Sequence, residues 1–358
     1  MEHRLDPWLA LAVVAILGAS LPTLHSVSRV VGTNLLLRQL AWGAAGLAIL
    51  WLLAGIRLDL YERLAPLAYA AGVLALVLVL LFGVARGGNR AWLAIGPFSG
   101  QPSEFARVGT VLMVGAWLAN RSRRRLGFQE MCVAAAIVGG PLVLVALEPD
   151  LGVALTYLPL LAVTLWLGGL PRGVWLGLIL VTTLGAYAGW HTVLKPYHKE
   201  RVLTVLSPDR DPFGAGYQVR QSKIAVGSGG LVGQGLGSGS QSQLRFLPAQ
   251  HTDFAFAVWS EATGFIGATL LLGAYALLLG RIGTAALTAG SRHGTVLAAL
   301  VGAWLTFQVV VNLGMVLGWL PTTGVTLPLF SYGGSSLIST CAALGIVQAV
   351  WRRRVVNQ

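Results

Sequence analysis

Asp253 is the first candidate for chemistry in this sequence. It ends a polar segment, Gln250-His251-Thr252-Asp253, and directly precedes an apolar run that begins at Phe254. A carboxylate at such a boundary is partly desolvated, which raises its proton affinity and suits a general base near neutral pH. The same position also suits the N-cap of a helix. One residue can do both.

Glu104 and Arg107 form a second candidate site. They lie three residues apart after Pro102, which suits the first turn of a helix, so both side chains share one helix face. The pair either only stabilises the helix start, or it faces a water-filled cleft and holds a charged substrate or a metal. An ionisable residue inside a membrane costs at least ~2.5 kcal/mol, which favours a functional explanation.

Glu148 and Asp150 place two further carboxylates around Pro149. Oxygen ligands of this kind bind a divalent cation such as magnesium or manganese. Asp150 is also well placed to cap the following helix. Both interpretations remain open from the sequence.

The composition shows what must position these residues. The chain has 358 residues, of which 55% are hydrophobic and 11% are charged, with a mean hydropathy of +0.72. Lipid offers no hydrogen-bond partners to the backbone, so long apolar runs must span a membrane as helices. We predict an all-α, polytopic membrane protein, with residues 1–358 forming a single membrane domain. About ten spans are expected, near residues 7–23, 35–54, 64–84, 103–118, 132–146, 152–167, 174–190, 254–279, 295–317 and 335–351.

Arginines predict the orientation of these spans. They occur in alternate connections, which marks that side as cytoplasmic and places both termini there. The protein is therefore expected to be a multi-pass protein of the cell inner (cytoplasmic) membrane. The same bias accounts for about half of the basic residues, so the net charge of +12 does not call for a nucleic-acid partner. The basic residues of the opposite side predict an anionic ligand.

Residues 191–253 form a large extracytoplasmic loop between the seventh and eighth predicted spans. Loops of this length are usually functional or disordered, and the Gly/Ser/Gln-rich stretch 227–243 favours disorder. The pattern of residues 217–226 instead predicts a short helix at the membrane surface. We expect a re-entrant or interfacial element here.

Two other features lie at membrane depth. Residues 320–335 are interrupted by proline and glycine, and such backbone persists only where it is buried in protein or lines a cavity. Arg38 lies within the second predicted span, where it either binds a ligand or extends its charge to the membrane surface.

Taken in order, six motifs resemble the SEDS family (shape, elongation, division and sporulation) of bacterial peptidoglycan polymerases. The short N-terminal tail and compact length are more similar to the elongation members than to the division members. The resemblance covers nearly the whole chain and rests on residues 88–92, 101–107, 148–152, 211–225, 246–254 and 321–335.

The chain departs from the family pattern at several positions. Arg107 replaces the usual lysine, and Glu148 replaces the usual glutamine of QPDLG. Ala91, Ala249 and Ala262 replace a usual Arg and two usual Glu residues, so no essential role is assigned to those three positions.

The resemblance implies the function. The family's substrate is lipid II, a disaccharide-peptide on undecaprenyl diphosphate, which is polymerised into β-1,4 glycan strands. Inversion at the sugar carbon implies a single displacement with Asp253 as general base. The predicted substrate-binding residues are Arg38, Arg90, Glu104, Arg107, Arg201, Gln218, Ser222, Lys223, His251, Thr252 and Ser331, and a magnesium or manganese ion held by Glu148 and Asp150 is the predicted cofactor.

The resemblance also implies a partner, a single-span class B penicillin-binding protein that acts as transpeptidase. Small residues at 264–268 and 302–303 are candidate contacts, although they would equally pack the chain's own helices. A flippase or transporter of a lipid-linked precursor is the alternative function, and a scaffold that only recruits a partner is a third. A transporter needs sites open alternately to both sides, whereas the unusual charges here gather on one side.

Overall fold

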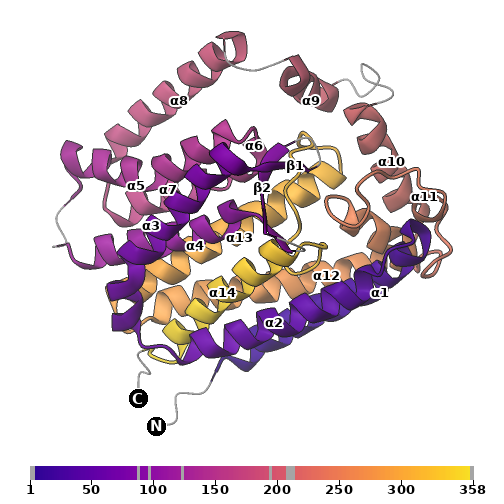
Figure 1. The fold of residues 1–358 in the computed structure, drawn as a ribbon, viewed down its shortest axis with the longest axis horizontal. Coiled ribbons are helices and arrows are strands. Elements are labelled where there is room, and N and C mark those ends of the chain that lie inside the picture. The colour runs from indigo at the N-terminus through magenta and orange to yellow at the C-terminus, as the bar shows by residue number, and fades with distance from the viewer. Residues whose placement is uncertain are drawn as a thin grey trace.

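The computed structural model describes residues 5–86, 89–95, 98–121, 125–192, 196–206 and 214–354, which form mainly helices (Figure 1). The first seven helices are α1 (Pro7–Val31), α2 (Leu35–Gly55), α3 (Leu58–Phe82), α4 (Pro102–Ala119), α5 (Phe128–Leu147), α6 (Leu151–Leu155) and α7 (Leu158–Leu167). The rest are α8 (Arg172–Thr192), α9 (Pro196–Leu206), α10 (Ala215–Ser228), α11 (Ser240–Gln243), α12 (Ala255–Thr288), α13 (Arg292–Val316) and α14 (Gly334–Trp351).

The expected all-α membrane architecture is confirmed. Among the described residues, eight helices are long and apolar enough to cross a membrane. The other two predicted spans correspond to α4, which carries Glu104 and Arg107, and to the broken pair α6–α7. The count of about ten is therefore a fair approximation.

A small antiparallel sheet was not predicted. Strands β1 (Val84–Arg86), β2 (Asn89–Ile95) and β3 (Phe98–Gly100) follow α3 in the order β1-β2-β3. Arg86 pairs with Asn89, and Ile95 pairs with Phe98. The sheet brings the end of α3 back to Gln101, where α4 starts.

Helices α13 and α14 form the interior of the bundle. In the most apolar 18 residues of α13 and α14, 61% and 67% of the residues are buried. Helix α3 packs against α4, and α14 packs against α2. In α8, by contrast, none of the corresponding residues is buried, and most of the helix lies apart from the others (Figure 1). Val174, Trp175 and Leu178 near its start pack against a small cluster that includes Leu126 and Leu165. The candidate residues on α4 are thus in the packed core, whereas α8 contacts the bundle through its start.

The start of α1 and the end of α14 lie at the same end of the bundle (Figure 1). Asp6, which is fully buried, caps α1 by accepting hydrogen bonds from Trp8 and Leu9, and it pairs with Arg281 of α12 at 2.8 Å. Gln348 of α14 accepts from the Asp6 N–H at 2.8 Å and donates to its carbonyl at 3.1 Å. We call this cluster of Asp6, Arg281 and Gln348 the terminal clasp.

Residues 214–254 pack against a break in α12. Gly264 has φ 67° and ψ −162°, which interrupts the helix and frees its backbone. Phe265 donates to the Gly230 carbonyl at 2.8 Å, and Gln234 donates to the Glu261 carbonyl at 3.0 Å. The Glu261 carboxylate accepts from two N–H groups at the start of α11. The predicted helix at 217–226 is confirmed as part of α10, its place at the membrane surface stays a prediction, and the glycine-rich stretch is packed rather than disordered.

Candidate active site

Asp253 lies in a turn directly before α12, at the end of the bundle opposite the terminal clasp. It is not the N-cap that the sequence suggested, because Phe254 takes that position and no side chain caps the helix. The backbone turns at Ala249, whose carbonyl accepts hydrogen bonds from the N–H groups of Thr252, Asp253 and Phe254. The carboxylate is therefore free for another role.

The broken stretch between α13 and α14 holds this turn in place. Ser331 donates from Oγ to the Thr252 carbonyl at 2.5 Å and accepts from the Leu327 N–H at 3.0 Å. The Tyr332 N–H donates to the His251 carbonyl at 2.8 Å, and the rings of these two residues are 5.8 Å apart. Three of the predicted site residues, His251, Thr252 and Ser331, thus come together beside Asp253.

Two glycines let other segments approach the site closely. Gly324 has φ +76°, and a Cβ atom there would be 3.9 Å from Oδ2 of Asp253. At Gly152, a Cβ atom would be 2.0 Å from the Thr323 carbonyl oxygen, so only glycine allows this contact. The turn before α6, the Asp253 turn and residues 321–325 therefore converge on one region.

Burial raises the pKa of Asp253 to about 6. A hydrogen bond from the Thr252 side chain and the positive charge of Arg201 lower this pKa, whereas the negative charge of Asp150 raises it. Arg201 belongs to α9 and donates to the Thr322 carbonyl at 3.1 Å. The arrangement gives a carboxylate that can accept a proton near neutral pH, with a cation within electrostatic reach.

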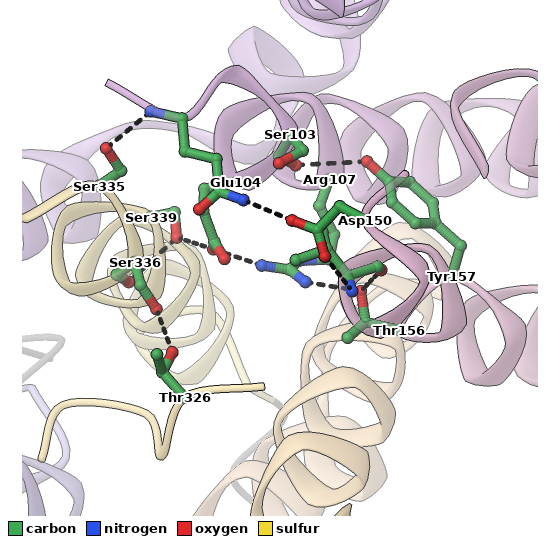
Figure 2. Close-up of polar contacts among 12 residues, drawn as sticks. Ser103, Glu104, Arg107, Asp150, Thr156, Tyr157, Thr326, Ser335, Ser336 and Ser339 are labelled. Carbon is green, nitrogen blue, oxygen red and sulfur yellow. Dashed lines mark hydrogen bonds and ion pairs between the residues drawn. The ribbon is translucent and has the colours of Figure 1, made fainter. Parts of the chain in front are cut away.

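Glu104 and Arg107 are inside the bundle (Figure 2). Arg107 is 0% exposed and Glu104 is 3% exposed, and the two side chains form an ion pair. Arg107 also donates from Nη1 to the Thr156 hydroxyl at 2.6 Å and lies over the Trp304 ring, while Ser339 donates to Glu104 at 2.8 Å. The burial favours the stabilising interpretation of this pair over an open cleft, and substrate contact stays a prediction.

Gln101, directly before the helix that carries this pair, bonds to the carboxylate turn and to α14. Its Nε2 donates to Oδ2 of Asp150 at 2.9 Å, and its backbone N–H donates to the Ser335 hydroxyl at 3.0 Å. Asp150 also caps α6 by accepting from the Val153 N–H at 3.2 Å, as one interpretation of the sequence expected. The starts of α4, α6 and α14 are thereby fixed to one another.

Glu148 is 1% exposed, and neither of its carboxyl oxygens has a hydrogen-bond partner. Burial, and then the charge of Asp150, raise the pKa of Glu148 to about 8. A cation or a proton would satisfy these oxygens, so the pair fits the predicted ion. Among the described residues, however, no group of three or more His, Cys, Asp or Glu side chains is suited to a metal. The ion stays a prediction.

The other predicted residues lie further from Asp253 or on the surface. Ser222 of α10 is buried and donates to the Val316 carbonyl at 2.8 Å, and Lys223 packs over Gly318, so this helix is docked on the end of α13. Arg38 is exposed near the start of α2, and Arg90 donates to the Gly83 carbonyl at 3.2 Å. Gln218 is half-buried on α10. Their roles in substrate binding stay predictions.

Part of the sequence interpretation lies outside the described residues. Gly88, Asp211, Pro212 and Phe213, which belong to the six motifs, and the basic residues Lys195 and Arg210 are among these.

Sequence reasoning missed several residues of the site. Thr156, Trp304 and Ser339 complete the surroundings of the buried pair, but each occurs in an apolar span without a recognisable motif. Asn312 was also missed, although an amide in the apolar predicted span 295–317 was a usable signal.

Comparison with known proteins identifies the class of protein that carries this site. The model of the cell cycle protein family of FtsW, RodA and SpoVE matches residues 4–355. The chain is 39% identical over 352 residues to the peptidoglycan glycosyltransferase MrdB of Escherichia coli (strain K12), covering 98% of this chain and 94% of that protein. It is 39% identical over 368 residues to a probable peptidoglycan glycosyltransferase FtsW of Thioalkalivibrio sulfidiphilus, covering 99% and 91%.

Solved structures agree with this. A chain from a peptidoglycan synthase complex, studied for how it coordinates polymerization and crosslinking, is similar with a TM-score of 0.82 and 37% identity, covering 97% of this chain and 98% of that one. The rod shape determining protein RodA of Thermus thermophilus is similar with a TM-score of 0.73 and 32% identity, covering 99% and 98%. The chain belongs to the SEDS family, and the resemblance found in its sequence is confirmed.

Proposed function

We propose that this chain is a peptidoglycan glycosyltransferase that polymerises lipid II into β-1,4 glycan strands during cell elongation, with Asp253 as general base. The family membership supports the activity. Asp253 supports the mechanism, because it is a partly buried carboxylate with a raised pKa and a nearby arginine. The position and raised pKa of the Asp253 carboxylate are the observation that carries the proposed mechanism.

In the proposed reaction, Asp253 accepts the proton of the acceptor 4-hydroxyl as that oxygen bonds to the anomeric carbon of the donor. The bond from this carbon to the diphosphate breaks on the opposite face, which inverts the configuration. Arg201, close enough to affect the pKa of Asp253, would stabilise the negative charge of the departing diphosphate. A divalent cation bound by Glu148 and Asp150 would add positive charge, but no step depends on it.

An apolar pocket near the site suits the polyprenyl tails of the substrate. It has a volume of about 480 Å³ and lies between α3 and α4, next to β2 and β3. Ala71, Gly72, Phe105 and Leu112 are among its lining residues, and the small ones keep it open. Pro102 also lines it, so the pocket begins at the same helix start that carries Glu104.

The direct test uses purified protein and lipid II. Glycan strands resolved by electrophoresis are expected from the parent protein and not from Asp253→Asn. A protein that moves lipid II across vesicle membranes without making strands would support the flippase alternative instead. Movement and polymerisation are measured on the same preparation, so the two functions are separated by one experiment.

We further propose that both termini are cytoplasmic in the inner membrane. Arg292 donates to the Arg121 carbonyl at 2.9 Å and Arg352 donates to the Ala54 carbonyl at 3.3 Å, so the basic connections meet at the terminal-clasp end. This clustering supports the orientation, because basic residues are enriched on the cytoplasmic side. Single cysteines placed after Arg57 and in α10 should be labelled by an impermeant reagent only in α10. The reverse pattern would overturn the orientation.

A class B penicillin-binding protein is the proposed partner, supported by the similarity to a chain of a peptidoglycan synthase complex. The small residues expected to face that partner contact the chain itself. A Cβ atom at Gly264 would meet the Gly233 and Leu231 backbone, and one at Gly302 would meet Ile282. Phe265 and Ile266, which are 65% and 54% exposed, offer free surface on α12 instead.

Co-purification with the cognate transpeptidase tests this partnership. A Phe265→Ala/Ile266→Ala variant should lose the complex while the purified chain alone keeps its polymerase activity. Leu287→Ala is the matched control, because this side chain is 89% exposed at the other end of the same helix. If neither the parent nor the control protein forms a complex, and the transpeptidase does not change activity, the partner is excluded.

A further inference from the structure

Asn312 is a buried amide close to the end of α13, at the end of the bundle where Asp253 lies. It belongs to α13 and is 0% exposed. Its Nδ2 donates to the Asp253 carbonyl at 2.9 Å and to the Val325 carbonyl at 2.8 Å. An amide nitrogen has two hydrogens, so this residue uses both donors on backbone carbonyls of two different segments.

Neither of these segments has regular secondary structure to hold it. Asp253 is in the turn before α12, where no side chain caps the helix, and Val325 is in the stretch between α13 and α14. The bonds from Ser331 and Tyr332 join the two segments to each other. Tyr275 of α12 donates to the Pro328 carbonyl at 2.6 Å, and Thr326 shares a hydrogen bond with Ser336 of α14 at 3.3 Å, but both of these contacts hold the second segment.

Asn312 bonds both segments to a helix of the bundle, α13. Among the described residues, it is the bundle-helix side chain that bonds to both segments at once. One of its donors bonds to the carbonyl of Asp253 itself, so it fixes the position of the backbone from which the carboxylate extends. Gly324, which faces that carboxylate, is one residue from Val325. The amide thus fixes the Asp253 turn and residues 324–325, the two segments that meet at the carboxylate.

We propose that Asn312 is a positioning residue that holds the backbone of Asp253 against residues 324–325, so that the carboxylate meets the acceptor hydroxyl in a reactive geometry. This inference rests on the proposed role of Asp253 as general base. It does not make Asn312 a catalytic residue, since its amide acts through Asp253. A displacement of a catalytic group by about 1 Å can lower a rate by about 10².

The test is Asn312→Leu, which keeps the side-chain size and removes both donors. We expect kcat to fall by about 10–10² while KM for lipid II stays within about twofold. Gln308→Met is the matched control. Gln308 is one turn earlier on α13 and also buried, and its Oε1 has no hydrogen-bond partner. The control should keep kcat per folded molecule, because among the described residues no hydrogen bond joins this amide to the Asp253 turn or to residues 324–325, and an apolar side chain of similar size replaces an unpaired oxygen.

The pH profile separates positioning from a merely structural role. Asp253 is influenced by burial, the Thr252 hydroxyl, Arg201 and Asp150, with His251 in the same turn. A released Asp253 turn gains water, so the acidic limb of the kcat profile should move to lower pH in Asn312→Leu. An unchanged limb, with activity that follows only the amount of folded protein as in Gln308→Met, would overturn the proposal.

Two further variants, Asn312→Ser and Asp253→Asn, complete the test. If Asn312→Leu does not accumulate in membranes, Asn312→Ser, which keeps one donor, is measured in the same way with the same criteria. Asp253→Asn distinguishes the two levels of the argument. If Asp253→Asn is active, the proposal that Asp253 is the general base is wrong. If Asp253→Asn is inactive but the Asn312 variant keeps a parent-like kcat, only the positioning role of Asn312 is wrong.

Discussion

Arg107 and Glu104 form an ion pair that solvent does not reach, with 0% and 3% of their surfaces exposed. The other terminal nitrogen of Arg107 donates to the Thr156 hydroxyl, and the guanidinium lies over the Trp304 ring. The pair therefore joins α4 to α6, α13 and, through Ser339, to α14.

The first prediction follows from this burial. Arg107→Ala leaves the Glu104 carboxylate buried without its partner, which should cost about 3–5 kcal/mol of folding stability. Arg107→Lys restores the lysine usual in the family but loses the two-pronged contact, so a smaller loss is expected. Thermal unfolding in detergent measures both. Full stability combined with lost polymerisation would show instead that the pair contacts substrate.

Asp253→Asn should lower polymerisation by about 10² or more, because an amide cannot accept the proton of the acceptor hydroxyl. The unfolding temperature should change little, since the carboxylate caps no helix. A variant that still polymerises at the parent rate would remove Asp253 from its role.

The pH dependence of the parent enzyme gives a separate prediction. The pKa of Asp253 is raised to about 6, and only the ionised form can act as a base. The value of kcat should therefore be level above pH 7 and fall about tenfold for each pH unit below 6. An acidic limb centred near pH 4 would show that the working base is a solvated carboxylate elsewhere.

Glu148 predicts a pH dependence of stability. Its pKa is raised from 4.5 to about 8, so the folded protein keeps the proton that the unfolded chain loses above pH 4.5. The stabilising contribution is complete below pH 4.5 and is lost as the pH rises to about 8. Glu148→Gln should thus be more heat-resistant than the parent at pH 8 and similar to it near pH 5. Parallel unfolding curves at all pH values would contradict this.

The predicted cation can be tested on the same pair of proteins. If Glu148 and Asp150 bind magnesium or manganese, adding the ion at pH 8 should raise the unfolding temperature of the parent but not of Glu148→Gln. Samples without the added ion and chelator-treated samples serve as controls. An equal response of both proteins would place any ion effect elsewhere in the molecule.

The sequence predicted the spans well because lipid imposes a simple rule on apolar length. It also located Asp253, since a lone carboxylate before an apolar run is conspicuous. The surroundings of that residue were harder to predict. Asn312 is 59 residues away along the chain, and nothing local shows which carbonyls its amide will meet.

Backbone irregularity was the other limit. The interruption of α12 at Gly264 lies inside an apolar run that reads as one continuous helix, and residues 230–235 bond to the backbone groups that the break frees. The N-cap role expected for Asp253 was wrong for a similar reason. Local propensity favoured it, but the turn at Ala249 moved the helix start by one residue.

The terminal clasp has a consequence for how the protein is made. Asp6 is synthesised 275 residues before Arg281 and 342 residues before Gln348. Until then the buried carboxylate has neither its counter-ion nor the amide that pairs with its backbone. The early helices must therefore be inserted well before α12 and α14 are available to dock on them. Nascent chains arrested before residue 348 should remain open to proteases at the start of α1, whereas chains in which α14 has been inserted should be protected.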